Sequence, residues 1–314
     1  MLKRIIITGS SGPLGVVLTK ECIKSGIEVL AVVRPESPRR KDIPDSHLVK
    51  IVDMDISDIE QLESSSLGKY DACFHLAWSH TGDEGRNDPL LQAENIQNTL
   101  KAAKCAKKLG CTVFVGAGSQ AEYGRANHKV DELSETHPDT WYGCTKLAAG
   151  QLVFEYCRQN GMRCNWVRIF GVYGPYENNY ILSSYVIQML LAGQEPMLTP
   201  CGQIWDYVYC EDVAKALVKI GEIAPQSSIY CLGSGTARPL IEYVTIIRDA
   251  IDSNLPLGIG AKTYGEYQIM HLEADISKLK RDIGDVIRTP FEEGIKKTIA
   301  WYRQKYKKVT SLRG

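Results

Sequence analysis

The sequence has few of the features that mark membrane, secreted or nucleic-acid-binding proteins. Among its 314 residues, no apolar run approaches the roughly 20 residues that span a bilayer. Lys+Arg and Asp+Glu are both 37, so the formal net charge is zero and predicts no nucleic-acid or membrane partner. The apolar run Ile5–Ile7 follows two basic residues, as in a signal peptide, but Thr8 and Gly9 interrupt it at once. We therefore expect no signal peptide and a cytoplasmic protein.

Zinc and disulfide signatures are missing as well. The ten cysteines are scattered without CxxC spacing, and no His/Cys cluster has the spacing of a zinc site. In a chain of this length without a secretory signal, such cysteines are expected to be reduced thiols that fill apolar positions. We expect no bound metal, and a core large enough for one large domain or two intimately joined ones.

Short β-branched runs alternate with helix-like stretches through the first half of the chain. This alternation predicts an α/β fold, a doubly wound parallel sheet of the Rossmann type with helices on both faces. The expected strands are Arg4–Thr8, Glu28–Val33, Leu48–Val52, Ala72–Leu76, Thr112–Val115 and Arg163–Ile169. The expected helices are Leu14–Ser25, Ser57–Ser65, Asp88–Leu109 and Trp141–Asn160. Because the alternation breaks after Gly174-Pro175, we expect a cofactor-binding domain over 1–175, with 204–222 returning to it, and a smaller, interleaved substrate-binding region over 176–314.

A glycine-rich segment follows the first expected strand. Thr8-Gly9-Ser-Ser-Gly12-Pro-Leu-Gly15 stands between that strand and the first expected helix. Glycines at this spacing let the backbone turn sharply and approach a pyrophosphate at the helix N-terminus. A plain strand-to-helix turn would look similar, but the strand before and the helix after are the context that a dinucleotide-binding loop requires.

The residues after the second expected strand bear on the choice between NAD and NADP. An acid there accepts hydrogen bonds from the ribose hydroxyls, whereas a basic residue favours a 2′-phosphate. Here Arg34 ends the strand, Arg39, Arg40 and Lys41 follow, and no acid stands at its tip. We predict NADP(H), with NAD(H) as the alternative; a basic surface loop would carry the same residues. Asp55, after the third expected strand, either accepts from an adenine amino group or caps the next turn.

A tyrosine and a lysine occupy one face of an expected helix, because Tyr142 and Lys146 are one turn apart. An ammonium beside a phenol lowers the phenol's pKa, so that the tyrosine can exchange a proton near neutral pH. Chance produces such pairs in many helices, but Ser119 lies at the carboxyl end of a central expected strand, in the segment that follows Thr112–Val115, and points into the same crevice. We predict that Ser119 holds a substrate oxygen, Tyr142 exchanges its proton and Lys146 grips the nicotinamide ribose. Asn95 either binds a relay water or packs within its helix.

A series of short motifs spans most of the chain. In order they are Thr8-Gly9-x-x-Gly12-x-x-Gly15, Asp55-Ile56, His75-Leu76-Ala77, Ser119-x-x-x-Tyr123-Gly124, Tyr142-x-x-x-Lys146, Arg168-x-x-Gly171-x-Tyr173-Gly174-Pro175, Asp206-Tyr-Val-Tyr-x-x-Asp212-Val-Ala and Ala274-Asp275-Ile-Ser-Lys278. The series resembles the extended short-chain dehydrogenase/reductase family, in its nucleotide-sugar branch. That resemblance implies a Rossmann domain, a nicotinamide cofactor and hydride transfer at a sugar carbon. The cofactor contacts that follow from it are Thr8, Gly9, Ser11, Gly12, Pro13, Leu14, Gly15, Arg34, Asp55, Ile56, Leu76, Ala77, Asn95, Tyr142, Lys146 and Phe170.

The residues after Ser119 narrow the reaction within this family. In 4,6-dehydratases the catalytic hydroxyl is followed by Asp-Glu, whereas here Gln120 and Ala121 follow, and neither can act as a carboxylate acid or base. Two reactions then remain, reduction of a nucleotide-linked 4-keto-6-deoxysugar by exchangeable NADPH and 4-epimerisation with tightly held NAD. The basic loop favours the reductase, and the stretches 119–124 and 203–207 resemble reductases of 3,6-dideoxyhexose pathways, such as CDP-abequose and CDP-paratose synthases. A non-catalytic NADP(H)-sensing module is a further alternative.

Departures from the family's pattern fall in the substrate region. Trp205 stands where many relatives carry an arginine, and Gly171 replaces the usual asparagine. Residues 264–271 lack the arginine that relatives often place on the diphosphate. Arg238 is a candidate to supply that positive charge. Trp205 either stacks on a base or sugar or packs between domains. The expected substrate contacts are Ser79, Ser119, Gln120, Tyr142, Gly171, Asn179, Trp205 and Arg238. The resemblance also implies a homodimer through the helices at 88–109 and 141–160.

Overall fold

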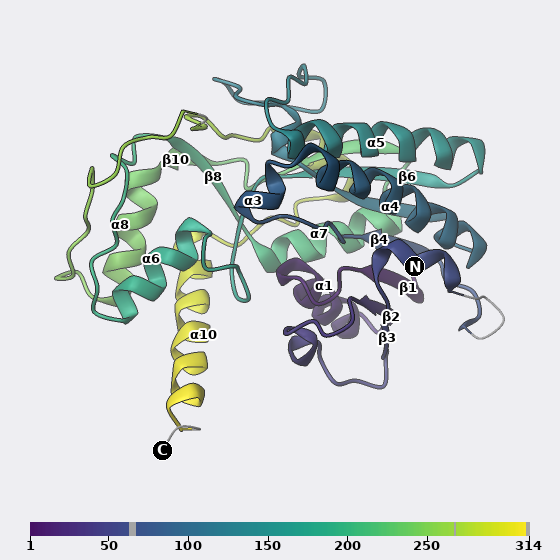
Figure 1. Cartoon of the computed structure of the whole chain (residues 1–314), viewed down its shortest axis with the longest axis horizontal. Coiled ribbons are helices and arrows are strands. Elements are labelled where there is room, and N and C mark those ends of the chain that lie inside the picture. Colours follow the sequence, from purple (N-terminus) through teal and green to yellow (C-terminus); the bar gives the residue numbers. More distant parts are fainter. Residues whose placement is uncertain (63–66, 267, 312–314) are drawn as a thin grey trace.

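Seven parallel strands form the main sheet, in the order β3-β2-β1-β4-β5-β6-β9 (Figure 1). The computed structural model describes residues 1–62, 67–266 and 268–311. The strands are β1 (Arg4–Thr8), β2 (Glu28–Val33), β3 (Val49–Asp53), β4 (Ala72–His75), β5 (Val113–Ser119), β6 (Arg163–Ile169) and β9 (Ser228–Leu232). Strand order reverses beside β1, as in a doubly wound sheet. The predicted α/β fold of the Rossmann type is therefore confirmed.

Helices cover both faces of this sheet, which explains why its strands are apolar without alternation. On one face α4 (Pro89–Lys108) and α5 (Trp141–Gln159) lie side by side, and on the other lie α1 (Pro13–Lys24) and α7 (Cys210–Ile223) (Figure 1). Along β1, Ile6 packs toward α4 and α5, whereas Ile5 and Ile7 pack toward α1 and α7. Small residues of α4 and α5, such as Ala102 and Ala149, let these helices approach the sheet closely.

A second sheet of three short strands lies beyond the carboxyl ends of the first. Its order is β10-β8-β7, with β7 parallel and β10 antiparallel to β8. The strands are β7 (Gly171–Tyr173), β8 (Ile204–Tyr209) and β10 (Ala237–Pro239), and the helices of this region are α6 (Leu182–Leu191), α8 (Leu240–Ile251), α9 (Ser277–Ile283) and α10 (Phe291–Ser311). The remaining short elements are η1 (Arg40–Asp42), η2 (Ile56–Gln61), η3 (Gln120–Glu122) and α3 (Asp83–Arg86).

Two elements differ from the expectations. Strand β5 continues to Ser119 instead of ending at Val115, because Gly116 and Gly118 leave room for the Trp166 ring; a Cβ at either glycine would lie 2.4 Å from that ring. The expected helix Ser57–Ser65 is a 3-10 helix over Ile56–Gln61, and residues 63–65 lie outside the described residues. The chain also crosses between the sheets more than once, since β9 follows β8 in sequence, so the division of domains at residue 175 stays a prediction.

The cysteines are free thiols, nine of them buried and Cys144 exposed. Across residues 1–62, 67–266 and 268–311, no helix is both long enough and apolar enough to cross a membrane. Within the same ranges, no group of three or more His, Cys, Asp or Glu side chains is arranged to hold a metal ion.

Candidate active site

A cleft of about 1220 Å³ opens at the carboxyl ends of the central strands. We call its lining residues in segments 9–13, 32–39 and 54–56 the glycine-loop half. Those in 171–207, together with Leu240, Lys262 and Gln268, are the small-sheet half. Ligand pockets typically have volumes of about 300–1,000 Å³. The cleft therefore has room for a dinucleotide and a second ligand, at the edge where open parallel sheets bind ligands.

The glycine loop has the geometry of a pyrophosphate cradle. Gly9 has φ +73°, and a Cβ there would lie 2.7 Å from the amide nitrogen of Ala77. A Cβ on Gly15 would lie 2.2 Å from the carbonyl oxygen of Gly9, so α1 packs directly onto the loop. Gly12 is the N-cap of α1 and offers no capping side chain, which leaves amide groups of the first turn free for an anion. These residues fit a dinucleotide.

The three arginines after β2 have different surroundings. Arg40 pairs with Asp53 (Nε–Oδ1 2.9 Å), and Arg39 donates a hydrogen bond to Asn178 across the cleft. Arg34 is exposed and lines the cleft, and its guanidinium makes no hydrogen bond or ion pair with any residue that the structure describes. Arg34 is therefore the guanidinium of this loop that is available to a ligand.

Ser119, Tyr142 and Lys146 come together on the wall of the cleft, as predicted for a proton-transfer site. Ser119 ends β5, and its side chain hydrogen-bonds to that of Tyr142, near the start of α5. The Lys146 Nζ donates to the carbonyl oxygen of Ala117 at 2.6 Å and lies 3.6 Å from the centroid of the Trp78 ring. Burial lowers the pKa of Lys146 to about 7.

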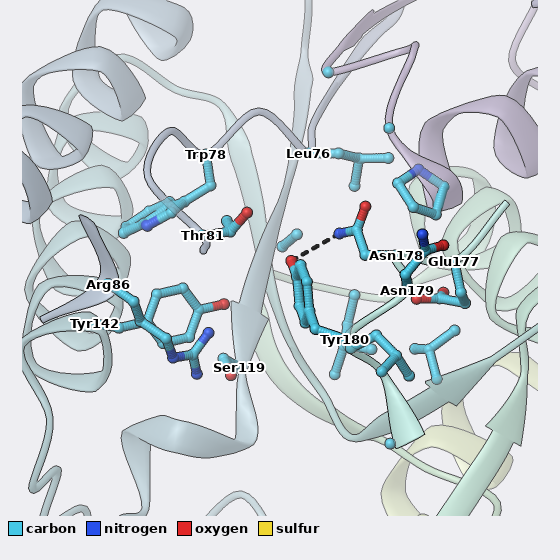
Figure 2. A pocket seen from close by; sticks show the side chains of 18 of the residues that line it. Leu76, Trp78, Thr81, Arg86, Ser119, Tyr142, Glu177, Asn178, Asn179 and Tyr180 are labelled. Atoms are coloured by element: carbon cyan, nitrogen blue, oxygen red, sulfur yellow. Dashed lines mark hydrogen bonds between the residues drawn. The ribbon is translucent and has the colours of Figure 1, made fainter. Parts of the chain in front are cut away.

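The electrostatics of Tyr142 differ from the expectation. Lys146 was expected to lower its pKa, but burial raises the pKa of Tyr142, and the opposing influences come from Arg86 and the Ser119 hydroxyl. Arg86 belongs to α3, and its guanidinium carbon lies 3.7 Å from the centroid of the Tyr142 ring (Figure 2). The expectation was wrong because the ammonium of Lys146 is directed to Ala117 and lies 5.8 Å from that centroid.

A buried ion pair supports Ser119 from behind. Glu122 accepts hydrogen bonds from Ser119 N (2.9 Å), Trp166 Nε1 (2.9 Å) and Arg168 Nε (2.8 Å). Arg168 also donates to the Tyr123 hydroxyl at 2.8 Å. Because Glu122 is fully engaged away from the cleft, it fixes the backbone at Ser119 and is not free to act on a ligand.

Most of the predicted contacts line the cleft, and five do not. The predicted residues on its wall are Gly9, Ser11, Gly12, Pro13, Arg34, Asp55, Ile56, Leu76, Ala77, Ser79, Ser119, Gln120, Tyr142, Lys146, Phe170, Gly171, Asn179 and Trp205. Thr8 lies behind the loop, bonded to His75, and Leu14 and Gly15 belong to the packed start of α1.

The fourth, Asn95, binds the protein backbone. Its Oδ1 accepts from Ser79 N at 2.7 Å and its Nδ2 donates to Ser79 O at 3.2 Å. This pair of bonds fixes the loop after β4, which carries Trp78. Packing, the second of the two roles considered for Asn95, is thus the role it has in the structure.

Arg238 does not reach the cleft. Its guanidinium pairs with Glu292 (Nη1–Oε1 2.6 Å), and Lys262 is the cation that lines the small-sheet half instead.

Asp55 caps η2 by accepting a hydrogen bond from Ser57 N at 2.9 Å, and it also lines the cleft. A Cβ on Gly171 would lie 2.5 Å from Asp206 O and 2.9 Å from Trp205 Nε1, so the two departures at 171 and 205 fit each other sterically.

Sequence reasoning missed Arg86, Trp78, Glu177 and Lys262, all on the wall of the cleft. They reach it from loops or a single-turn helix, where no periodicity or motif marks them. Trp78 directly follows the motif His75-Leu76-Ala77. Its position after that motif, at the end of β4, was the one signal that could have predicted its place on the cleft wall.

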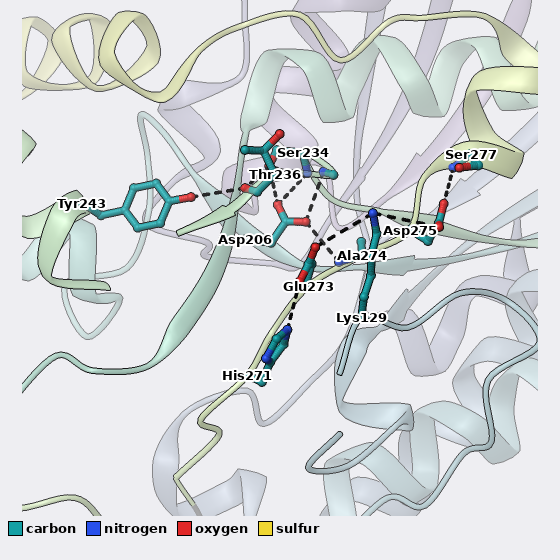
Figure 3. A network of polar contacts seen from close by, with 11 residues as sticks. Lys129, Asp206, Ser234, Thr236, Tyr243, His271, Glu273, Ala274, Asp275 and Ser277 are labelled. Atoms are coloured by element: carbon teal, nitrogen blue, oxygen red, sulfur yellow. Dashed lines mark hydrogen bonds and ion pairs between the residues drawn. The ribbon is translucent and has the colours of Figure 1, made fainter. Parts of the chain in front are cut away.

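The small-sheet half is tied together by one buried carboxylate, Asp206 (Figure 3). It accepts hydrogen bonds from Ser234 N and Oγ, Gly235 N and Ala274 N, at 2.6–3.2 Å. Asp206 thus connects β8, the loop after β9 and the segment before α9. Two of the sequence motifs, those at 206–214 and 274–278, meet here.

A family model described as the NAD dependent epimerase/dehydratase family matches residues 5–233. The chain belongs to this family. One relative is the trifunctional UDP-glucose 4,6-dehydratase/UDP-4-keto-6-deoxy-D-glucose 3,5-epimerase/UDP-4-keto-L-rhamnose-reductase of Arabidopsis thaliana. It is 26% identical over 319 residues, which cover 96% of this chain and 47% of that protein. The chain therefore spans about half the length of that relative.

Two solved structures share the fold. One is UDP-N-acetylglucosamine 4-epimerase from Methanobrevibacter ruminantium in complex with UDP-N-acetylmuramic acid (TM-score 0.86, 22% identity, 96% of this chain and 99% of that one). The other is MoeE5 in complex with UDP-glucuronic acid and NAD (TM-score 0.85, 24% identity, 96% of this chain and 99% of that one). At these identities the likeness shows the fold and leaves the reaction of this family member open.

Proposed function

We propose that this member of the epimerase/dehydratase family is an NADPH-dependent reductase of a nucleotide-linked 4-keto-6-deoxysugar. The observation that carries the proposal is the meeting of Ser119, Tyr142 and Lys146 on the wall of a cleft that continues into the glycine loop. A hydroxyl, a phenol and an amine at one point suit proton transfer to an oxygen. The nucleotide-sugar substrate follows from the family's nucleotide-sugar branch and from the named ligands of its relatives.

The roles of the side chains follow from their positions. A bound nicotinamide supplies the hydride. Ser119 holds the keto oxygen through its hydroxyl, and Tyr142 gives that oxygen its proton. Lys146 lies on the same wall with its ammonium held by the carbonyl of Ala117, and it exchanges its own proton near neutral pH. Trp78 covers Lys146 and excludes water from it.

Arg34 supports the choice of NADPH. It follows the last residue of β2 and lines the cleft, and its guanidinium has no partner among the described residues. The strand tip carries no acid that would repel a 2′-phosphate. An unpaired guanidinium suits a phosphate, which it can bind through two hydrogen bonds.

The cleft wall beside Ser119 argues against dehydration. Gln120 lines the cleft, Ala121 is buried, and the next residue, Glu122, is bound to Arg168. No residue of this η3 turn therefore offers a free carboxylate beside the catalytic hydroxyl.

A 4-epimerase with retained NAD is the second candidate, and two contacts favour it. Arg39 bonds Asn178 across the cleft, and Lys20 Nζ donates to the Tyr176 hydroxyl at 2.5 Å. The first contact joins the glycine-loop half to segment 176–178 and the second joins α1 to it, and both would slow the exchange of a bound dinucleotide. A cofactor that stays bound suits a reaction without net reduction.

Turnover tests the reductase. Purified protein is incubated with NADPH and a panel of nucleotide-linked 4-keto-6-deoxysugars, and NADPH loss is followed by absorbance. We expect turnover that falls by about 100-fold or more in Tyr142→Phe. Tyr156→Phe, on the same helix but away from the cleft, is the matched control. If no sugar drives NADPH loss, the reductase proposal fails.

Two further measurements separate the alternatives. Arg34→Asp should weaken NADPH binding about tenfold more than NADH binding, because the phosphate loses a charged partner; Lys41→Asp in the same loop is the control. Equal losses for both cofactors would contradict NADP(H). Protein that retains NAD and interconverts sugar epimers without consuming cofactor is the epimerase, and protein that binds NADPH but turns over no sugar is the sensing module.

Assembly and location stay predictions. We propose a homodimer through the outer faces of α4 and α5 in the cytoplasm. Mass measurement in solution tests the dimer.

A further inference from the structure

Arg86 places a permanent positive charge on the ring of the proposed proton donor. It ends the four-residue helix α3, lines the cleft, and lies with its guanidinium carbon 3.7 Å from the centroid of Tyr142 (Figure 2). A guanidinium does not lose its proton at any pH that the protein tolerates. The charge at this ring is therefore constant.

Among the side chains that the structure describes, a set that leaves out Asp83 on α3, no carboxylate forms an ion pair with Arg86. Glu122, the carboxylate whose charge acts on Tyr142, is bound to Arg168 and Trp166. The charge of Arg86 lies over the ring of Tyr142 and on the wall of the cleft.

The groups that face Tyr142 come from five elements. They are Arg86 on α3, Lys146 on α5, the Ser119 hydroxyl on β5, Glu122 on η3 and the Trp78 ring on the loop after β4. Of the two cations, Lys146 is bonded to a backbone carbonyl, and burial brings its pKa to about 7, so only part of the population is charged at neutral pH. Arg86 is the cation of this set that is both fully charged and stacked on the phenol.

We propose that Arg86 is a positioning residue for proton transfer, which holds the Tyr142 ring and stabilises the phenolate that remains after the proton has left. The direction of this transfer rests on the proposed function. As hydride from NADPH forms a C–H bond at the keto carbon, the O–H bond of Tyr142 breaks and an O–H bond forms on the sugar oxygen. NADPH becomes NADP+, and the phenolate then takes a proton from water. Arg86 acts through Tyr142 and is not required to touch the sugar.

The first test needs no substrate. The tyrosinate absorbance of the whole protein is titrated with pH, and the curve of Tyr142→Phe is subtracted to isolate Tyr142. Arg86→Gln should move the isolated titration to higher pH, because the phenolate loses its adjacent positive charge. Arg86→Lys should restore part of the shift, since it keeps the charge and loses the planar stacking. Arg158→Gln, an exposed arginine at the far end of α5 that pairs with Glu155, should leave the titration unchanged.

The second test uses turnover. Arg86→Gln should lower kcat at neutral pH about tenfold, with KM nearly unchanged, and should move the alkaline limb of the pH profile to higher pH. An unchanged Tyr142 titration in Arg86→Gln overturns the proposal, as does a rise in KM alone, which would make Arg86 a substrate contact. If the titration shifts while no sugar is turned over, the role of Arg86 stands and the reductase assignment fails.

Discussion

The glycine-loop half and the small-sheet half of the cleft differ in how the chain forms their walls. In the first, segment 9–13 presents its backbone to the cleft, shaped by Gly9, Gly12 and Gly15 and by the first turn of α1, and segments 32–39 and 54–56 complete the wall. In the second, side chains arrive from β7, β8, α6, α8 and the segment near residue 262, and the buried carboxylate of Asp206 ties their supports together. The shape of the glycine loop depends on the absence of side chains, whereas the shape of the small-sheet half depends on contacts between side chains.

The difference matters for what each half can recognise. Backbone amides and a helix N-terminus bind a pyrophosphate whatever the rest of the ligand is, so this half suits a common cofactor. Aromatic rings, amides and one ammonium collected from distant segments can be exchanged one at a time. Variation among family members is therefore expected in the small-sheet half, where residues 171 and 205 depart together from the usual pattern.

The largest effect is expected in the glycine-loop half. Gly15→Ala would place a Cβ 2.2 Å from the carbonyl oxygen of Gly9, and because this contact is between backbone atoms, the loop itself must move. We expect cofactor affinity to fall by about 100-fold or more, the equivalent of about 3 kcal/mol. Gly265→Ala, in open space beside the other half, should change nothing. Calorimetric titration with NADPH compares the two variants, and equal affinities would refute the backbone account of this half.

The next largest effect is expected in the small-sheet half, from a side chain. Asp206→Ala leaves the amides of Ser234, Gly235 and Ala274 without their acceptor, and buried amides without a partner are costly. We expect the free energy of unfolding in urea to fall by about 2 kcal/mol. Asp206→Asn, which keeps one acceptor oxygen, should lose less. If Asp206→Ala weakened NADPH binding as much as Gly15→Ala does, the two halves would not be independent.

The same contrast explains what the sequence could predict. The main sheet, the loop at 8–15 and the meeting of Ser119, Tyr142 and Lys146 follow from local patterns, because a strand end and a helix start place their residues without help from the rest of the chain. The contact between Arg86 and Tyr142 depends on the path of a loop and a single helical turn. No periodicity encodes such a path, so this partner was missed.

Two expectations about charged side chains show what sequence spacing cannot predict. Arg238 was a candidate to supply the charge on the diphosphate because 264–271 contains no arginine, but its guanidinium forms an ion pair with Glu292, which is distant in sequence. Lys146 was expected to tune Tyr142 because they are four residues apart, but the carbonyl of Ala117 competes for the ammonium. Spacing gives proximity, whereas the direction of a long side chain depends on every acceptor within reach.

The smallest effect concerns Glu177, which lines the cleft where its two halves approach each other. Burial raises the pKa of Glu177 to about 7, although Arg39 opposes the shift. A carboxyl group with a raised pKa in the folded state contributes stability that is fully present below its unfolded pKa and is lost as pH rises through about 7. In the same range, ionisation adds a negative charge to a wall that faces a pyrophosphate. We therefore expect NADPH affinity to fall by about threefold between pH 6 and 8, the size of a weak interaction between exposed charges.

Substitution at this position tests whether one charge couples the two halves. Glu177→Gln should flatten the pH dependence of NADPH binding, because the amide does not ionise. Glu36→Gln, an exposed acid in the loop after β2, should leave it unchanged. If Glu177→Gln and wild type lose affinity in parallel above pH 7, another group carries the effect, and the contact of segment 176–178 with Arg39 does not link cofactor binding to the small-sheet half.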